Sequence, residues 1–259
     1  MSLNWMDVTK LSFNSLLLLE RVQLSWFPDW LPEQDLGIAL QMNPVVEWFM
    51  RHKCPELNAW LDKVMKVHSK KDINPEEARQ AEIAVMVTIE DLLVYVLDPA
   101  IYDSLKFNQW DSTELTSLVN FTGKTVIDVG AGPGRLTLVA AGQAAAVFAV
   151  EPVTNLRGYL KEKARKNGFK NVFCVDGTIT DIPFPDGFAD VTMGGHVYGD
   201  FPEQESKEML RVTKPGGMVI QMGVSSKESG EFLLSKGFQR ASYEEPGVGT
   251  MGKYWLIRR

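Results

Sequence analysis

The hydrophobic pattern divides the chain into two parts of different character. Before about residue 110, apolar and charged positions recur with helical spacing, and Gly37 is the only glycine. Asn74 is placed to cap a helix that begins at Pro75, and Asp98-Pro99 favours its end. Residues 1–110 are therefore expected to form a helical region with a lid, substrate-binding or dimer role. Its predicted helices cover residues 11–24, 44–52, 55–69 and 75–97.

From residue 111 onward, apolar runs of strand length alternate with helical segments. The predicted strands cover residues 124–129, 145–150, 172–175, 189–193, 218–222, 239–244 and 252–258. The predicted helices cover residues 112–120, 134–142, 155–167, 203–212 and 226–236. Such alternation predicts an α/β domain over 111–259, with a doubly wound, Rossmann-like sheet that is mostly parallel. Because no helix separates the last two strands, at least one of them is expected to be antiparallel.

The most informative motif follows the first predicted strand and reads Asp128-Val-Gly-Ala-Gly-Pro-Gly-Arg135. Its three glycines allow a sharp turn and the close approach of a ligand, and the next helix presents N–H groups at its start; these glycines are Gly130, Gly132 and Gly134. Asp128 would repel the pyrophosphate of a dinucleotide, but it suits a ligand with an ammonium and a sulfonium, such as S-adenosylmethionine. Arg135 stands where the dinucleotide pattern G-x-G-x-x-G requires a small residue, which favours the same ligand.

Two further acids end the second and third predicted strands, at the edge where doubly wound sheets bind ligands. Glu151 can accept both ribose hydroxyls, or it is a solvated acid at a strand end. Asp176 can accept a hydrogen bond from an adenine amino group, while Gly177 and Thr178 offer backbone N–H groups. Asp-Gly is also a common turn sequence, so a turn without a ligand is the alternative for this pair.

Residues 124–223 resemble the Rossmann-like (class I) S-adenosylmethionine-dependent methyltransferases, and most of all the small-molecule group related to the ubiquinone/menaquinone C-methylases. The resemblance implies that Asp128 and Gly130 face the methionine part of the cofactor, Glu151 the ribose and Asp176 the adenine, and that S-adenosylhomocysteine is the product. Gly194, at the end of the fourth strand, joins the candidate cofactor-binding residues. The family usually has an aromatic residue where this chain has Ala189, which concerns local packing. The matching strings are Val126-Ile-Asp-Val-Gly-Ala-Gly-Pro-Gly-Arg-Leu-Thr137, Ala149-Val-Glu-Pro152, Asp181-Ile-Pro-Phe-Pro-Asp-Gly187 with Ala189-Asp-Val191, and Leu210-Arg-Val-Thr-Lys-Pro-Gly-Gly217.

Methyl transfer by in-line displacement requires a positioned acceptor and the exclusion of water, and a general base only when the acceptor must lose a proton. His196, in the loop after the fourth strand, is the best candidate for that base. A role in lining the pocket, or in packing alone, stays open for it, and Tyr198 and Asp200 are weaker candidates. Three aromatic residues precede the α/β part and could close over the site: Tyr102, Phe107 and Trp110. A second cluster could line an acceptor pocket or a dimer seam, although core packing is the alternative for all six: Trp26, Phe27 and Trp30.

Composition narrows the class of protein further. The 259 residues carry a net charge of −6, which argues against a dedicated nucleic-acid binder. The two cysteines lack metal-ligand spacing, so no metal site is expected, and no apolar run is long enough to span a bilayer. With no secretory signal visible, a cytoplasmic protein with a small-molecule acceptor is expected, as a possible homodimer.

Two alternatives to a methyltransferase share part of these features. A regulatory or scaffold protein would bind S-adenosylmethionine without transferring its methyl group. A nicotinamide-dependent oxidoreductase would share the fold and Glu151, but it would not share Asp128 or the glycine spacing. The Asn-Pro-Pro-Tyr signature of exocyclic-amine and amide methylases is absent, which disfavours DNA bases and glutamine as acceptors.

Overall fold

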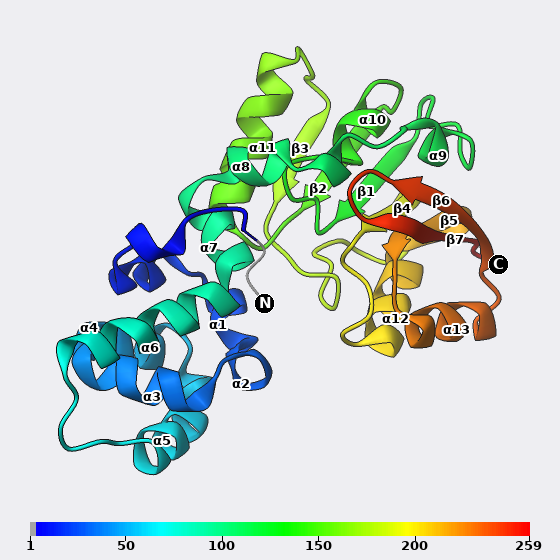
Figure 1. Cartoon of the computed structure of the whole chain (residues 1–259). Coiled ribbons are helices and arrows are strands. Elements are labelled where there is room, and N and C mark those ends of the chain that lie inside the picture. Colours follow the sequence, from blue (N-terminus) through cyan, green and yellow to red (C-terminus); the bar gives the residue numbers. More distant parts are fainter. Residues whose placement is uncertain (1–3) are drawn as a thin grey trace. The chain divides into compact units, whose positions relative to one another are not determined.

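The computed structural model describes residues 4–259, and the chain divides between Tyr102 and Asp103 into two compact units (Figure 1). The hydrophobic pattern placed this boundary at residue 110. The segment from Asp103 onward associates with the α/β unit because the Asp103 carboxylate accepts hydrogen bonds from Tyr159 (2.7 Å) and Lys163 (2.6 Å). Among residues 4–259, none of the helices combines the length and the hydrophobicity that a membrane span requires.

The first unit is built from short helices, and within residues 4–102 the structure has no strand. Its core consists of fully buried apolar side chains, among them Phe13, Phe27, Leu36, Leu61 and Met86. Its α-helices are α1 (Arg21–Ser25), α2 (Phe27–Trp30), α3 (Glu33–Met42), α4 (Pro44–Lys53), α5 (Asn58–Val67), α6 (Pro75–Thr88), α7 (Glu90–Leu97) and α8 (Pro99–Ser104). Its 3₁₀ helices are η1 (Val8–Lys10), η2 (Phe13–Leu18) and η3 (Pro55–Leu57).

Helix α3 was not among the predicted helices, and it contains Gly37, a residue type that disfavours helix interiors. The structure gives the glycine a packing reason: a Cβ atom at this position would lie 2.7 Å from the Cβ of His68, at the end of α5. Gly37 therefore permits α3 and the end of α5 to approach closely. The helix propensity of the residues around Gly37 does not reveal this contact.

Two of the predicted helices are broken in the structure. The segment 11–24 divides into η2 and α1, because Glu20 and Gln23 form a capping box that starts a new helix. The segment 75–97 divides at Ile89, and the carboxylate of Glu90 then accepts backbone hydrogen bonds from residues 4–6. A buried carboxylate must have hydrogen-bond donors, and three backbone N–H groups distant in sequence supply them to Glu90. These tertiary contacts override the continuous helical pattern.

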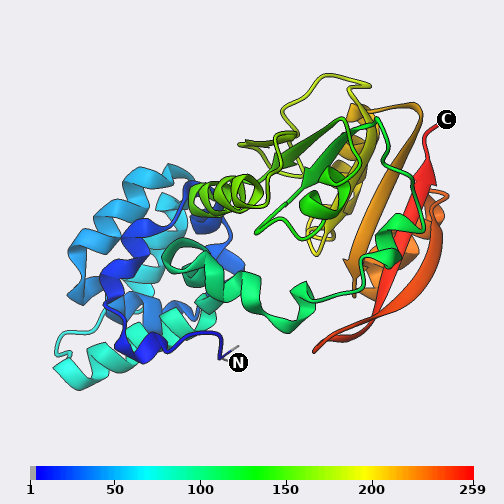
Figure 2. The ribbon, with the colours of Figure 1, turned by 90° about the horizontal axis from the view of Figure 1, so that it is seen from above.

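The second unit contains a seven-stranded sheet in the order β3-β2-β1-β4-β5-β7-β6. Strands β1 to β5 are parallel, and β7 is antiparallel to both β5 and β6, which confirms the antiparallel strand predicted at the tail. Figure 2 shows β7 and β6 (red and orange) on one side of the parallel strands. The strands are β1 (Thr125–Val129), β2 (Ala146–Val150), β3 (Val172–Val175), β4 (Ala189–Gly195), β5 (Thr213–Val224), β6 (Gln239–Glu245) and β7 (Gly249–Ile257).

Helices cover both faces of this sheet, as the alternating pattern predicts. One face packs against α9 (Thr113–Thr116), α10 (Thr137–Ala141) and α11 (Thr154–Lys166), through clusters that include Leu115, Leu136 and Leu160. The other face packs against α12 (Pro202–Val212) and α13 (Lys227–Ser235), through Met209 and Leu233. Figure 1 shows α12 and α13 together below the sheet. The short helix η4 (Lys106–Asn108) precedes α9.

The helix after the glycine motif begins at Thr137, three positions later than the predicted start at residue 134. Gly130, Gly132 and Gly134 have φ angles of +64°, +51° and +93°, so none of them can belong to a right-handed helix. The motif is therefore a longer turn followed by a five-residue helix.

Candidate functional site

The carboxylate of Asp128 is buried at the end of β1. Its Oδ2 atom accepts a hydrogen bond of 2.5 Å from the hydroxyl of Thr137, the first residue of α10, and only 1% of the residue is exposed. Burial raises the pKa of Asp128 to about 7; interactions with Thr137 and Arg135 oppose the shift, and the negative charge of Glu151 adds to it. The acid therefore connects β1, before the glycine turn, with α10, after it. Because its pKa is about 7, a cation bound nearby would favour the ionised form of this carboxyl group.

Glu151 holds the glycine turn from the neighbouring strand. One carboxylate oxygen accepts the N–H of Gly132 and the other accepts the N–H of Val153, each at 2.9 Å. Burial raises the pKa of Glu151, while these two hydrogen bonds act in the opposite direction. A ribose would therefore have to bind the remaining lone pairs of oxygens that already accept backbone hydrogen bonds.

The third predicted acid lies in a different environment. The Asp176 side chain is 77% exposed at the end of β3 and forms an ion pair of 2.6 Å with Arg157 of α11. Gly177 has a φ of +153°, and a Cβ there would lie 2.7 Å from Pro183, so the turn requires glycine. The N–H of Thr178 donates to the carbonyl of Asp181 across 3.4 Å, which already occupies one of the donors expected to face a ligand.

The loop after β4 covers the glycine turn. Val197 lies so close that a Cβ on Gly130 would come within 2.5 Å of it, and one on Gly194 within 2.8 Å. The buried carboxylate of Glu205, in α12, accepts the N–H groups of Gly199 and Phe201, each at 2.8 Å. The loop is therefore held in one conformation against the residues predicted to contact the cofactor.

His196 occupies an unusual position in this loop. It is a non-glycine residue with a φ of +57°, and its N–H donates to the carbonyl of Met222 in β5. Its imidazole lies over Gly223, where a Cβ would come within 2.6 Å of Nε2. A non-glycine residue in the left-handed region persists only where its surroundings enforce it, so the position of this ring is strongly specified.

A buried carboxylate from the C-terminal hairpin binds the histidine. The Glu245 oxygens lie 2.8 and 3.0 Å from His196 Nε2, and Oε1 lies 2.6 Å from Arg135 Nη1. Tyr243 donates to Oε2 at 3.2 Å. Burial raises the pKa of Glu245, but the hydrogen bond from His196 and the charge of Arg135 outweigh it and leave the pKa below its ordinary value.

Two of the three aromatic residues expected near the site are in contact with this network. The guanidinium of Arg135 lies 4.8 Å from the ring centre of Trp110 and 5.9 Å from that of Phe107, and Phe107 lies 5.7 Å from the His196 ring. Tyr102 belongs to the first unit, where its ring contacts Tyr95. In the second cluster considered from the sequence, Phe27 is a fully buried core residue, Trp26 stacks on Trp30 at 5.9 Å, and 45% of Trp30 is exposed.

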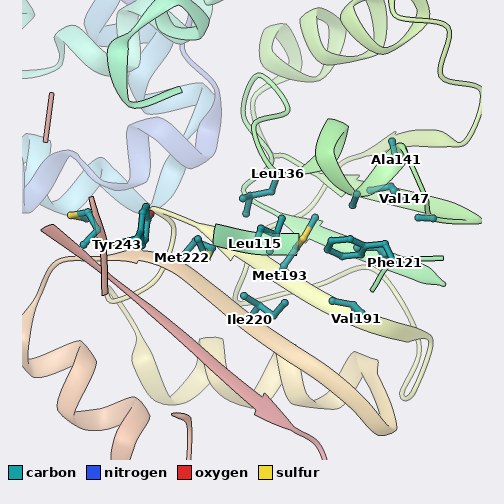
Figure 3. Close-up of a cluster of buried hydrophobic side chains, with 14 residues drawn as sticks. Leu115, Phe121, Leu136, Ala141, Val147, Val191, Met193, Ile220, Met222 and Tyr243 are labelled. Carbon is teal, nitrogen blue, oxygen red and sulfur yellow. The ribbon is translucent and has the colours of Figure 1, made fainter. Parts of the chain in front are cut away.

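Sequence reasoning missed Glu245 and Tyr243 altogether. The only local signal was Arg135, which stands out as a large residue in the glycine motif, and its partner lies more than one hundred positions later in the chain. Figure 3 shows Tyr243 with Met222 at one end of the apolar cluster that underlies the network, and Phe121 with Val147 at the other end. The hairpin thus brings polar side chains beside the loop that bears His196.

Comparison with known proteins concerns the second unit. Residues 127–221 match the model of a family described as a methyltransferase domain. A demethylmenaquinone methyltransferase of Anoxybacillus flavithermus is 32% identical over 108 residues, which cover 40% of this chain and 46% of that protein. Phosphoethanolamine N-methyltransferase 3 of Arabidopsis thaliana is 30% identical over 143 residues, 52% of this chain and 28% of that protein. The chain thus spans about half the length, or less, of these curated relatives.

A likeness in fold extends further than the likeness in sequence. A chain in the structure of the complex between the Haloferax volcanii Trm112 methyltransferase activator and a methyltransferase superposes with a TM-score of 0.51. The superposition covers 64% of this chain and 94% of that one, at 14% identity, and it therefore concerns the fold alone.

Proposed function

We propose that this chain is a Rossmann-like, S-adenosylmethionine-dependent methyltransferase of the ubiquinone/menaquinone methylase type, which transfers a methyl group to a small-molecule acceptor. The match of residues 127–221 to a methyltransferase-domain family and the similarity to a demethylmenaquinone methyltransferase support this proposal. The observation that carries the proposal is the pair of buried carboxylates, Asp128 and Glu151, that flank the glycine turn. S-adenosylmethionine supplies an activated, electrophilic methyl group, so the protein must bind it, align the acceptor and exclude water.

The charge of the two carboxylates supports this cofactor. Burial raises the pKa of both groups, which means that the surroundings offer them too little positive charge. A ligand that carries an ammonium and a sulfonium would supply it. A dinucleotide pyrophosphate would add negative charge beside two buried acids, at a high cost in free energy.

The topology argues against the oxidoreductase alternative. A classical dinucleotide-binding sheet has the all-parallel order 3-2-1-4-5-6, whereas here the antiparallel β7 lies between β5 and β6. The second alternative, a cofactor-binding regulator without transfer activity, is disfavoured by the strained loop that bears His196, because such strain is typical of working sites.

The roles proposed for single residues follow the positions of the strands. Asp128 and Gly130 face the methionine part of the cofactor, and Gly132 and Gly134 belong to the same turn. Gly194 lies in β4, where it pairs with Val129. Glu151 binds the ribose through its remaining lone pairs. The exposed Asp176 binds the adenine amino group, with Gly177 and Thr178 at the same edge.

Further expectations concern the whole protein. The small-molecule acceptor is proposed in analogy with the curated relatives, whose names refer to demethylmenaquinone and phosphoethanolamine. We propose a cytoplasmic protein that does not act on nucleic acid, in line with its net charge of −6. The helical unit is proposed to act as a lid, as part of the acceptor site or as a dimer surface.

The proposal is tested by calorimetry on the full chain with S-adenosylmethionine, S-adenosylhomocysteine and NADH. Binding of the first two at micromolar concentrations, and its weakening by Glu151→Gln, is expected. The exposed Glu231→Gln, in α13, is the matched control and should bind as wild type does. A folded protein that binds neither sulfur compound contradicts the proposal, and tight binding of NADH favours the oxidoreductase.

A further inference from the structure

Arg157 connects the ends of the two strands whose acids are proposed to bind the nucleoside of the cofactor. It belongs to α11, which packs beside β3 (Figure 1). Its Nη1 atom donates to the carbonyls of Glu151 (2.6 Å) and Pro152 (2.7 Å), after β2, and to Oδ1 of Asp176 (2.6 Å), after β3. Its Nη2 atom donates to the hydroxyl of Thr154 at 3.1 Å. Because a guanidinium is planar, contacts at both nitrogens fix the whole group relative to β2.

Asp176 depends on this arginine for its orientation. The Asp176 side chain is 77% exposed, whereas that of Arg157 is 21% exposed. Within residues 4–259, no other side chain forms a hydrogen bond or an ion pair with the Asp176 carboxylate. An exposed carboxylate without such a partner samples several rotamers, and water competes for its lone pairs. Arg157 binds Oδ1 and leaves Oδ2 to accept a hydrogen bond from a ligand.

Arg157 also reduces the repulsion between two carboxylates. Burial raises the pKa of Glu151, and among the charged neighbours Arg157 acts to lower it and Asp176 to raise it. The two acids are therefore close enough to repel each other. A ribose and its base, bound side by side, require both carboxylates to face one ligand, which this repulsion opposes. The positive charge of Arg157 offsets the repulsion and keeps Asp176 at the site.

A purely structural role for Arg157 would have a different signature. The arginine would then serve only to bind the two carbonyls after β2, and its ion pair with an exposed acid would contribute little. Loss of the side chain would disturb the turn that bears Glu151, and every nucleoside ligand would bind more weakly to the same degree.

We propose that Arg157 is a positioning residue for base recognition: it orients Asp176 so that Oδ2 accepts the adenine amino group, and it thereby makes the site selective against a base with a keto oxygen at that position. This inference rests on the proposed methyltransferase function, in which Asp176 contacts the adenine. A carboxylate accepts hydrogen bonds and does not donate them, so it attracts an amino group and repels a carbonyl oxygen. The selectivity requires a fixed carboxylate, because a mobile one turns away from the carbonyl oxygen.

The test compares two ligands by calorimetry on the full chain: S-adenosylhomocysteine and S-inosylhomocysteine, in which a keto oxygen replaces the amino group. The wild type is expected to bind the first about 10- to 100-fold more tightly, which corresponds to a hydrogen bond to a charged group, and Arg157→Leu to lower this ratio about tenfold. The matched control is Arg165→Leu, which removes an exposed ion pair with Glu162 from the same helix and should keep the ratio. Equal weakening of both ligands in Arg157→Leu overturns the proposal.

Asp176→Asn shows whether Arg157 acts through this acid. A carboxamide can turn its N–H₂ group toward the keto oxygen, so this variant is expected to bind the two ligands with similar affinity. In the Asp176→Asn background, Arg157→Leu should change the ratio by less than about twofold, because two residues that act through one contact are not additive. A full effect of Arg157→Leu in that background contradicts the positioning role.

The outcomes separate this inference from the proposed function. If the wild type binds neither compound, the proposed methyltransferase function fails. If it binds both with equal affinity, the cofactor assignment stands and the inference fails. Urea unfolding shows which variants are folded. Arg157→Lys keeps a charge and N–H donors but loses the planar fork, so its ratio should lie between those of the wild type and Arg157→Leu. If Arg157→Leu does not fold, a wild-type ratio in Arg157→Lys overturns the proposal.

Discussion

Replacing Asp128 with asparagine should stabilise the protein near neutral pH while weakening cofactor binding. Asparagine keeps an oxygen that can accept the hydrogen bond from Thr137, and it removes a carboxylate that is buried at 1% exposure. The native protein must either keep this carboxyl protonated or bury its charge. Both choices cost free energy relative to an unfolded chain in which the carboxylate is solvated.

The magnitude follows from the shift in pKa. Burial raises the pKa of Asp128 from 3.8 to about 7. Roughly three pKa units at 1.36 kcal/mol each amount to about 4 kcal/mol. Because the folded state holds the proton more tightly, the wild type loses stability as the pH rises from about 4 to about 7, and the loss is constant above that range. The advantage of Asp128→Asn should therefore be largest above pH 7 and vanish near pH 4.

Urea unfolding of the full chain across this pH range measures the effect. Asp190 provides a control of opposite sign: although burial acts to raise its pKa, the interactions with Lys214 and Thr125 lower it overall. Its contribution is present above the unfolded pKa and is lost as the pH falls through the folded value, so Asp190→Asn should destabilise at neutral pH and not in acid. An Asp128→Asn variant whose stability follows that of the wild type at every pH would refute the reasoning.

Three further outcomes are expected. Gly223→Ala, whose Cβ would lie 2.6 Å from the His196 ring, should lower the rate of methyl transfer and leave S-adenosylmethionine affinity unchanged in calorimetry. Gly37→Ala should destabilise the helical unit by about 1–3 kcal/mol in urea unfolding, because its Cβ would lie 2.7 Å from that of His68. Asn74→Ala, which removes the cap of α6, should cost about 1 kcal/mol in the same assay.

The sequence predicts the sheet well because its signals are local. Strand β1 (Thr125–Val129) begins with the apolar pair Val126-Ile127, and Asp128 and then Gly130 follow; this pattern suffices to predict a buried parallel strand and the turn after it. The antiparallel pair at the tail follows equally from the missing helix between its strands. Because these features depend on residues that are close together in the chain, they can be predicted without knowledge of the fold.

The features that sequence reasoning missed depend on neighbours in space. Helix α3, with Gly37 inside it, was not predicted, and only the proximity of His68 explains a glycine inside this helix. Likewise, Glu245 resembles any charged residue near the end of a strand until β6 places it beside Arg135 and His196. A local sequence pattern cannot predict that the segments bearing Arg135, His196 and Glu245 contact one another in the fold.

The place of β7 between β5 and β6 has a consequence for biosynthesis. Until the ribosome has made the β6–β7 hairpin, β5 is the unprotected edge of a parallel sheet, with apolar residues such as Val219 and Ile220 along it. Such an edge invites pairing with other nascent chains until β7 covers it. The same hairpin contains Glu245, so its synthesis both covers the edge of the sheet and completes the group that orients His196.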